Sequence, residues 1–581
     1  MTAHKYWKFS IIEQILNKLS WDSKKNSNVI NSILRKLRQL VREPVLRKWL
    51  VGRLFGKYPG EPVFQAHYPS YLKEALPLTG EKPIWKQGEI SSNKPERPIH
   101  LPLAGQTLTL QPGQELDIFN NSFSDTETLL SLHRFAWLRI LGDTVDPAWV
   151  NTIWQAWSYK FGNPDNSWAW HPYTASERAI NILQFAIRHG IPSPMGDTLK
   201  ILSAHGPAIA EKLEYFGDHH TSNHLANNGR GLFILGLVLE MPNCINLGFS
   251  ILVEEAKRIF MKSGILREGS SHYHLLLAHN YRIALEIARK HLGSATLNLE
   301  ELEMIVKHIH SPISYLMLPG GMPLVGDISP DIPPAKLLEK FESPADIGPY
   351  NAAALISDGW LRFDSDNWSG LWHVPKDGWS HMPGHGHQDC GSFELHYDKI
   401  PIFIDPGRGS YGEDGEAALY FSARVHNSLT VDRAEPYPPN KPYFDDNFRR
   451  QISGPPPELK LKMNEVHLTF SGYSRLKSVG QLKRIWSFEG DVMSVSEIVN
   501  GSGHRIITRT LCTIFETEVV GNEVIMKSDG HTFKLRFEDG EINIESGIRW
   551  TAYGEGEPAT FIRFEKRVEL PWHGLFSLEM V

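Results

Sequence analysis

The sequence has little of what marks several common classes of protein. Its 581 residues include only three cysteines, Cys244, Cys390 and Cys512, which lie far apart and predict no disulfide framework. No apolar run approaches the roughly 20 residues that a membrane-spanning helix needs. Met1 to Ser20 lack the uninterrupted apolar segment and small-residue cleavage site of a secretory signal. The sequence therefore predicts a cytoplasmic protein, or a periplasmic or secreted one if an export signal was removed or is non-standard.

Motifs for nucleotide chemistry are also missing. The sequence has no Gly-x-x-x-x-Gly-Lys phosphate-binding loop and no cysteine-based zinc finger. These absences disfavour nucleotide-driven reactions and a nucleic-acid partner. Hydrophobic residues make up 41% of the chain and charged residues 22%, which is typical of an ordinary soluble protein. The composition gives no indication of oligomeric state.

Charge is segregated along the chain. Residues 1–55 hold twelve lysines and arginines against three acids, although the whole chain has a net charge of −6. Apolar residues in this segment fall on one helical stripe beside basic residues: Ile30, Ile33, Leu34, Leu37 and Val41. Residues 1–57 are therefore predicted to be a basic amphipathic helical arm. Such a helix suits weak contact with an anionic membrane surface, and a helix packed on the protein body is the alternative.

Hydrophobic patterning divides the rest of the chain. Residues 58–118 are rich in proline and glycine and predict an irregular connector with short strands. Helical periodicity over residues 119–320 predicts paired helices stacked in a ring or an array. The expected helices are Val150–Phe161, Ser176–His189, Asp197–Phe216, Leu232–Leu239, Leu247–Ser263, Tyr273–Leu292 and Leu299–Leu316.

Alternating apolar residues replace this pattern over residues 321–581. The expected strands are Ser392–Tyr397, Ser428–Val431, Leu459–Leu468, Gly480–Phe488, Val492–Val499, Ile506–Phe515 and Thr532–Phe537. Several short strands separated by turn residues are typical of a large antiparallel β-sandwich. The predicted class is α+β, with helices first and an antiparallel sheet domain second.

A histidine-rich motif is the strongest chemical signal in the sequence. His385-Gly386-His387 is followed by Asp405 and then by His426. Three imidazoles and a carboxylate can supply a His/Asp/His metal site and leave one histidine for chemistry. Zinc suits these ligands, and manganese suits the carboxylate oxygen. Surface histidines in turns are the alternative, since the chain contains 26 histidines.

A second group of polar residues precedes two predicted helices. Asn223-His224 stands before the apolar run that ends at Leu239, and Tyr273 stands at the start of another helix. Backbone N–H groups at helix N-termini favour anions, so these side chains are suited to hold a carboxylate and move a proton beside it. Taken singly, Asn223 is equally suited to be a helix cap and Tyr273 a core aromatic.

Aromatic residues near residue 165 point to sugar. Trp168, Trp170 and His171 follow the loop-like segment Gly162–Asn166, and indole rings pack on the C–H faces of sugars. We expect Trp168 and Trp170 to form a sugar platform. Trp154 and Trp157 are spaced one helical turn apart, which is more typical of a core.

Together these motifs resemble the heparinase II/III-like polysaccharide lyases, a superfamily of heparin, chondroitin and alginate lyases. The resemblance covers roughly residues 120–581 and rests on five matching segments: Asn223-His224, Glu268 to His274, Gly384 to His387, Asp405-Pro-Gly407 and Arg424 to Asn427. It implies an incomplete (α/α) toroid followed by layered antiparallel sheets, with the site between them. It also implies β-elimination at a uronic acid.

The resemblance assigns expected roles to individual residues. Asn223, with His224, would neutralise the substrate carboxylate, Tyr273 would be the acid and also a candidate base, and His385 the alternative base. Tyr411 and Arg424 are expected to contact the substrate. His387, Asp405 and His426 would bind one structural divalent metal ion, zinc or manganese.

The expected partner is an anionic, uronate-containing polysaccharide. Glycosaminoglycans such as heparan sulfate, chondroitin sulfate or hyaluronan are favoured over alginate. Any sulfate-binding groove would need local cations, for which Arg178, Arg230 and the substrate-binding candidate Arg267 are available. A metal-dependent glycan hydrolase and a non-catalytic carbohydrate-binding protein are the alternatives.

Overall fold

The structure is a computed structural model. It describes residues 40, 43–58, 68–73, 78, 80–292, 297–341, 349–381, 384–528, 530–538 and 540–581. The chain divides into two compact units, one comprising Met1–Val63 with Pro438–Ile452 and the other Phe64–Tyr437 with Ser453–Val581. None of the described helices is both long and apolar enough to cross a membrane.

The smaller unit packs around Trp49. This residue lies in α3 (Pro44–Leu54), which starts with proline, a residue suited to the first turn of a helix. Trp49 is 1% exposed and its ring lies 4.3 Å from that of Tyr443 and 5.9 Å from that of Phe444, measured between centroids. Tyr443 and Phe444 precede α17 (Asp446–Ser453). The large sequence separation explains why hydrophobic patterning did not predict this pairing.

The apolar stripe predicted for the N-terminal arm, from Ile30 to Val41, lies outside the described residues. The proposed contact with a membrane surface therefore stays a prediction. Within the described part of the arm, α3 carries the basic residues Arg47, Lys48 and Arg53.

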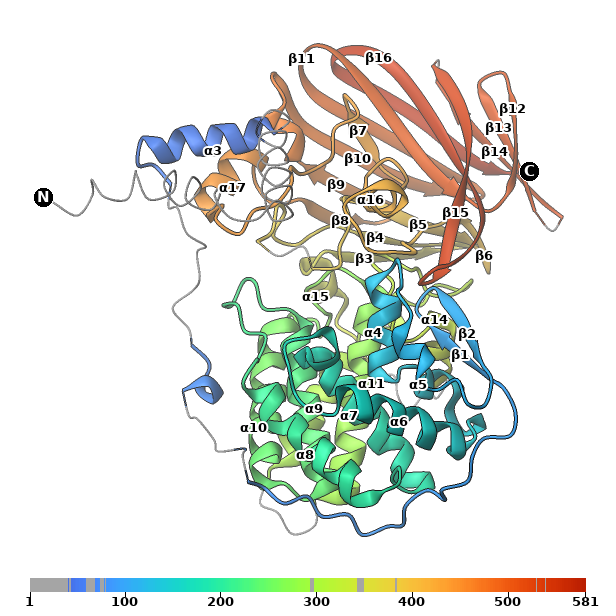
Figure 1. The fold of residues 1–581 in the computed structure, drawn as a ribbon. Helices are drawn as coiled ribbons and strands as arrows, with labels where there is room; N and C mark the ends of the chain where they lie inside the picture. The colour runs from blue at the N-terminus through green and yellow to red at the C-terminus, as the bar shows by residue number, and fades with distance from the viewer. Residues whose placement is uncertain are drawn as a thin grey trace, which may run out of the picture. The chain divides into compact units, whose positions relative to one another are not determined.

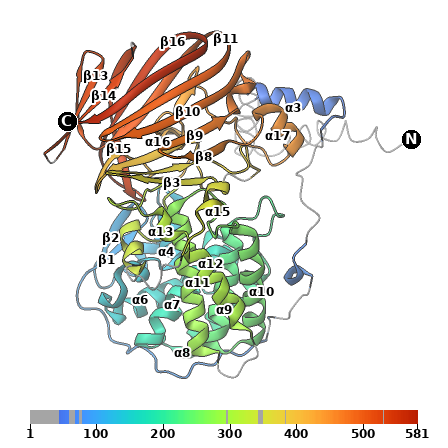
Figure 2. The ribbon, with the colours of Figure 1, turned by 180° about the vertical axis from the view of Figure 1, so that it is seen from behind.

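In the larger unit, a hairpin of β1 (Ile99–Leu103) and β2 (Gln106–Leu110) precedes the main helices (Figures 1 and 2). The helices are α4 (Thr126–Arg134), α5 (Trp137–Leu141), α6 (Pro147–Phe161), α7 (Pro172–His189), α8 (Met195–Ala210), α9 (Asn223–Leu239), α10 (Pro242–Ile259), α11 (Ser271–His291), α12 (Leu299–His310) and α13 (Ile313–Leu316). Helix α9 packs against α7, α8, α10 and α11. Its residues are almost all buried, which explains its lack of a polar face.

Small residues let these helices approach closely. A Cβ at Gly231 of α9 would overlap Ser176 of α7, and one at Gly248 of α10 would overlap the backbone of Phe233 in α9. Helix α9 is thereby held at the centre of the helical layer, with its N-terminus at the candidate site.

The strands of the larger unit form two antiparallel sheets besides the hairpin. The four-stranded sheet has the order β3 (Trp360–Ser365), β4 (Trp368–His373), β5 (Ser392–Tyr397) and β6 (Ile400–Phe403). The ten-stranded sheet contains β7 (Leu429–Val431), β8 (Glu458–Lys462), β9 (Glu465–Phe470), β10 (Val479–Glu489), β11 (Val492–Thr513), β12 (Glu516–Val520), β13 (Glu523–Ser528), β14 (His531–Phe537), β15 (Glu541–Ala552) and β16 (Glu555–Met580).

Strands β11 and β16 pair along most of their length and form the centre of the larger sheet. The sheet order is β12-β13-β14-β16-β11-β10-β9-β8, and β7 pairs with β11 while β15 pairs with β16. Short helices interrupt the strand region: α14 (Pro334–Leu338), α15 (Ala352–Ser357) and α16 (Gly415–Phe421). The backbone amide of Ile404 donates to Cys512 of β11 at 3.0 Å and joins the two sheets.

Candidate active site and metal centre

Asn223 lies at the first position of α9 and is held by a buried glutamate. Ser222 is the helix cap, because its hydroxyl accepts from the amide of His224. The Asn223 amide N–H donates to Oε1 of Glu268 at 2.7 Å, and its side-chain Nδ2 donates to Oε2 of the same residue at 2.9 Å. Nδ2 also lies 3.2 Å from Nε2 of His385. Asn223 therefore contacts the predicted site residue His385 and is not the cap of its helix.

Tyr273 is buried on α11, where its amide donates to the capping hydroxyl of Ser270 at 3.1 Å. Its hydroxyl lies 2.7 Å from the hydroxyl of Tyr411, which donates to the carbonyl of Ile328 at 3.0 Å. Because Tyr411 uses its hydrogen on Ile328, Tyr273 is the donor between the two hydroxyls. Burial raises the pKa of Tyr273 well above its ordinary value. Tyr273 is thus a protonated group near neutral pH.

His385 lies beside Tyr273 in a loop that is fixed by backbone contacts. Its amide donates to the carbonyl of Glu268 at 2.8 Å, and its carbonyl accepts from the amide of Asp327 at 2.8 Å. The preceding Gly384 has φ of +62°, and a Cβ there would overlap Glu268. The glycine of the motif is therefore needed to bring His385 to the helical side of the site.

Asp327 orients two histidines at once. Its Oδ2 lies 3.2 Å from Nδ1 of His385, and its Oδ1 lies 3.0 Å from Nε2 of His387 and 3.0 Å from Nη1 of Arg408. Burial opposes ionisation, but the hydrogen bonds and charges of the two histidines lower the pKa of Asp327 well below its ordinary value. When Nδ1 of His385 donates to this carboxylate, Nε2 keeps a lone pair and accepts from Asn223.

His224 belongs to a neighbouring group. Its Nδ1 lies 2.9 Å from Oε1 of Glu214, and its ring lies 4.6 Å from that of Tyr173. Nε2 of His171 lies 3.7 Å from the same carboxylate oxygen. Burial lowers the pKa of His224, but the hydrogen bond and charge of Glu214 outweigh this and raise the pKa above its ordinary value. The raised pKa extends the cationic form of His224 to higher pH, which suits the recognition of an anion.

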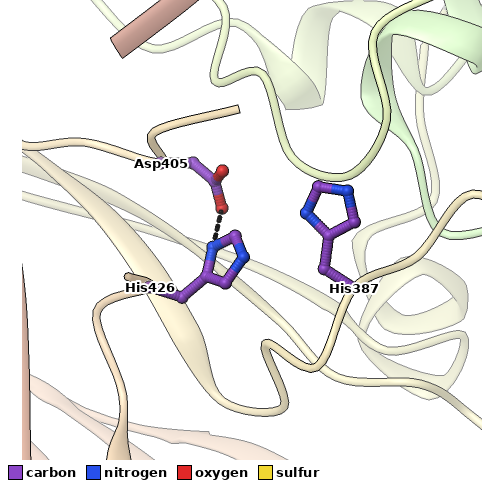
Figure 3. A group of neighbouring side chains, drawn as sticks. All are labelled: His387, Asp405 and His426. Carbon is purple, nitrogen blue, oxygen red and sulfur yellow. Dashed lines mark hydrogen bonds and ion pairs between the residues drawn. The ribbon is translucent and has the colours of Figure 1, made fainter. Parts of the chain in front are cut away.

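His387, Asp405 and His426 form a compact buried trio (Figure 3). Their potential ligand atoms all lie within 4.8 Å of one another. Nδ1 of His426 lies 3.2 Å from Oδ2 of Asp405, close to the roughly 3.3–3.6 Å that separates two ligand atoms of a tetrahedral zinc ion. Within the described residues, Nδ1 of His387 is buried without a hydrogen-bond partner. An orphaned buried nitrogen of this kind fits a metal ligand.

The outer contacts of the trio also fit a metal ion. Nε2 of His387 is bonded to the Asp327 carboxylate, and Nε2 of His426 lies 3.1 Å from the carbonyl of Tyr420. In metal-binding histidines, the N–H group of the second ring nitrogen generally donates a hydrogen bond to a carboxylate or a carbonyl. Each ring therefore has its other nitrogen available on the side of the trio.

Asn427 explains how residues from separate strands meet at this position. Its Nδ2 donates to the carbonyls of Phe393 at 2.6 Å and Ile404 at 3.0 Å, and its Oδ1 accepts from the amide of Cys512 at 2.7 Å. One side chain thereby ties β5, the residue after β6 and β11 together. This connection fixes the neighbouring His426 and the nearby Asp405.

Residues 348–572 match the protein family described as heparinase II/III-like, C-terminal. This match bears out, over residues 348–572, the resemblance to the heparinase II/III-like proteins that the sequence motifs predicted. No match was found among curated proteins.

Solved structures are similar to this chain in fold. A crystal structure of heparinase III has a TM-score of 0.60 and 15% identity, over 80% of this chain and 79% of its own. A mutant of a heparan sulfate lyase from Pedobacter heparinus has a TM-score of 0.51 and 17% identity, over 79% of this chain and 78% of its own. At these identities the likeness shows the fold, and it confirms the predicted helical toroid followed by antiparallel sheets.

Two residues that hold the candidate site together had no role in the sequence prediction. Glu268 was part of the motif that carries the resemblance, and Asp327 was not singled out at all. A signal for Asp327 exists, because it is a lone acid in the apolar segment Met322–Ile328. Charged residues in such segments are rarely buried without partners, so its position hints at a bonding role.

The predicted substrate contacts are placed unequally. Tyr411 joins Tyr273, as described above. Trp168 is 52% exposed and its ring lies 5.5 Å from that of His171. Arg424 is exposed, and its carbonyl accepts from Arg563 at 3.2 Å. Trp168 and Arg424 stay predictions as substrate contacts.

The prediction that Trp170 belongs to a sugar platform is wrong. Trp170 is 1% exposed, and its indole N–H donates to the carbonyl of Phe161 at 2.7 Å. Its short helix, Trp168–Trp170, turns the two tryptophans in different directions, so that only Trp168 reaches solvent.

The three arginines considered for sulfate binding have other partners in the structure. Arg178 is fully buried and donates to the carbonyls of His133 and Ala169, while Arg230 is buried against Glu177. Arg267, half-buried, donates to the carbonyls of Asp218 and Thr221 at 3.0 and 2.6 Å. These guanidinium groups hold the protein together, so we do not assign them to sulfate.

Proposed function

We propose that this protein is a polysaccharide lyase that cleaves uronate-containing polysaccharides by β-elimination. The observation that carries the proposal is the placement of a protonated tyrosine, a histidine and an amide in one group. The rings of Tyr273 and His385 are parallel with centroids 3.5 Å apart, and Nδ2 of Asn223 lies 3.2 Å from His385. Likeness to heparinase III and a heparan sulfate lyase supports the same reaction class.

The reaction requires a base, an acid and a partner for the substrate carboxylate. A base removes the hydrogen on C5 as a proton, and the released electron pair forms the C4–C5 double bond. The C4–O4 bond breaks, and the departing O4 takes a proton from the acid. Negative charge grows on the carboxylate during this step, so groups that stabilise that charge lower the barrier.

Each role fits a group in the structure. His385 accepts the C5 proton on Nε2, because Nδ1 is directed to Asp327. Tyr273 is the acid, since its raised pKa keeps the proton until O4 departs. One Nδ2 hydrogen of Asn223 is directed to Glu268 and the other to His385. In our account the arriving carboxylate takes the second hydrogen, which frees the lone pair of His385.

We further propose that His387, Asp405 and His426 bind one divalent cation, zinc or manganese. When bound, the ion supplies a fixed positive charge at the base of three loops. His387 then holds Asp327 through Nε2, and Asp327 holds His385. The trio positions the base and takes no part in the proton transfers.

The proposed substrates are glycosaminoglycans, with weakly sulfated or unsulfated polymers preferred. Arg178, Arg230 and Arg267 are engaged within the protein, which disfavours a strongly cationic groove. The test is to incubate the protein with hyaluronan, chondroitin sulfate, heparan sulfate, its unsulfated precursor and alginate, and to follow the ultraviolet absorbance of the unsaturated product. We expect absorbance to rise with at least one glycosaminoglycan. No rise with any polymer in the presence of added zinc or manganese would overturn the proposal.

A further inference from the structure

A cavity of about 380 Å³ lies next to Tyr411, because the preceding residues Gly409 and Ser410 are part of its lining. The site described above uses none of its lining residues. The β1–β2 turn, the segment before α4, the loop that carries Tyr411 and the end of β15 form its walls. The Tyr411 amide donates to the hydroxyl of Tyr553, a lining residue, at 3.3 Å. The Tyr411 hydroxyl lies 2.7 Å from that of Tyr273, so Tyr411 contacts both a lining residue of the cavity and the proposed acid.

The walls combine flat aromatic surface with hydrogen-bonding groups. Trp550 and Tyr553 provide rings, and Ser124 and Ser410 provide hydroxyls. A Cβ at Gly409 would overlap the indole of Trp550, so the glycine allows the ring to pack directly against the loop. The cavity volume falls within the roughly 300–1,000 Å³ that is usual for small-molecule sites. Rings for C–H faces and polar groups for hydroxyls are what a sugar residue requires.

The charge of the cavity is negative. Asp125 and Glu416 are among the lining residues, and no lysine or arginine is among the residues that line it. Asp125 accepts from the Tyr553 hydroxyl at 2.9 Å and from the amide of Glu127 at 2.9 Å, so its position is fixed. Glu416 is exposed at the start of α16. A sulfate or a second uronate in this cavity would meet two carboxylates.

We propose that this cavity is a subsite for an uncharged, unsulfated hexosamine residue, next in the polymer to the uronate at Asn223 and Tyr273. The inference rests on the proposed function, because it takes the polymer to run past Tyr273. The carboxylates of the cavity repel sulfate esters, whereas its hydroxyl groups and rings accommodate the neutral hydroxyl and N-acetyl groups of the sugar. The two carboxylates of the lining, Asp125 and Glu416, are the source of this selectivity for unsulfated stretches.

Binding measured without turnover tests this subsite. The inactive Tyr273→Phe protein is titrated calorimetrically with two tetrasaccharides of alternating uronate and N-acetylhexosamine, one unsulfated and one carrying 6-O-sulfate on the hexosamine. We expect the unsulfated tetrasaccharide to bind about fivefold tighter or more, as two carboxylates near one sulfate would require. Adding Glu416→Gln should reduce this preference by about threefold, since one of the two charges is removed. Glu413→Gln, an exposed neighbour outside the cavity lining, is the matched control and should leave the preference unchanged.

Equal binding of the two tetrasaccharides, no binding of either, or the same effect from both glutamate variants would overturn the subsite. Failure of the proposed function is seen separately. If wild-type protein forms no unsaturated product but the binding preference and its response to Glu416→Gln hold, the subsite stands and the lyase activity does not. If product forms but the preference is absent, the activity stands and the subsite does not.

Discussion

The imidazole of His385 lies flat against the ring of Tyr273, with centroids 3.5 Å apart and planes inclined by 9°. The two rings come from different parts of the chain, one from the sheet region and one from helix α11. A base and an acid on one side of a substrate match a reaction in which a proton leaves C5 and another joins O4. The relationship leads to separate tests of each group.

Replacement of Tyr273 by phenylalanine should abolish turnover while preserving the fold. The variant loses the donated proton but keeps the ring against His385. Acid–base groups generally contribute ~10²–10⁴-fold to rate, so a loss of that order is expected in initial-rate measurements. Tyr281→Phe is the matched control, because its buried hydroxyl on the same helix donates to the carbonyl of Leu252, away from the site. A Tyr273→Phe rate above a tenth of wild type would show that another group is the acid.

Asn223→Ala should reduce kcat more than it raises KM. The amide stabilises charge that is largest in the transition state, and its loss also removes the hydrogen bonds through which Nδ2 contacts Glu268 and His385. Steady-state kinetics on the preferred polymer measures both constants. Asn227→Ala, one turn later in α9, controls for the loss of a buried amide. An increase in KM alone would make Asn223 a binding residue and assign charge stabilisation to His224.

Glu214→Gln should shift the alkaline limb of the kcat/KM profile to lower pH. Burial and the charge of Arg134 lower the pKa of His224, whereas Glu214 and Glu268 raise it, with a net increase. Without Glu214, His224 loses its proton at lower pH and cannot serve as a cation for the carboxylate. Tyr273 does not set this limb, because its pKa is raised well above 10. An unchanged limb would remove His224 from substrate recognition.

The pairing of His224 with Glu214 also predicts how the stability of the protein varies with pH. The pKa of His224 is raised on folding, so its contribution is fully present below about 6.5 and is lost as pH rises through the folded value. The pKa of Glu214 is lowered, since its bond to His224 outweighs burial, so its contribution is lost as pH falls below about 4.3 towards the folded value. Thermal unfolding of wild type and Glu214→Gln should differ most between these limits. A constant difference from pH 4 to 9 would contradict the pairing.

His426→Ala should lose the proposed cation, whereas His396→Ala should keep it. Both histidines are fully buried, but His396 is bonded to Glu394 and lies outside the trio. Elemental analysis of purified protein measures occupancy, and thermal unfolding with and without chelator measures its effect on stability. We expect chelation to lower the Tm of wild type and His396→Ala but not of His426→Ala. Metal-free protein with full activity would reduce the trio to a hydrogen-bonded cluster.

Regular elements were predictable where local pattern and packing agree. Strand β5 spans Ser392–Tyr397 as its alternation predicted, and α11 spans Ser271–His291 against a predicted Tyr273–Leu292. The predicted strand Leu459–Leu468 is instead the hairpin β8–β9. Its turn has Met463 at φ +48°, a residue that gives no turn signal in the sequence.

One long strand was predicted as two. The predicted strands Val492–Val499 and Ile506–Phe515 belong to β11, which continues to Thr513. The intervening Asn500-Gly501-Ser502-Gly503 has the composition of a turn but forms an irregularity in the pairing with β16. Pairing with a partner strand decides between turn and bulge, and that partner is not visible in a local window.

The candidate site also contains residues that the sequence predicted and residues that it did not. Motifs indicated Asn223, Tyr273, His385 and Tyr411, and the structure brings these four side chains together. The sequence did not predict roles for Glu268 and Asp327, because these residues hold other side chains in place and such contacts are visible only in the folded structure. The prediction for Trp170 was wrong because the sequence does not show whether an aromatic residue near a loop faces solvent or the core.

The most direct test of the account is the fate of solvent oxygen during cleavage. The protein is incubated with its preferred uronate polymer in oxygen-18-labelled water, and the masses of the products are measured by mass spectrometry. β-Elimination adds no water, so we predict unsaturated products without labelled oxygen. Products heavier by one labelled water, with no ultraviolet absorbance from a C4–C5 double bond, would show a hydrolase and contradict the roles assigned to Tyr273 and His385.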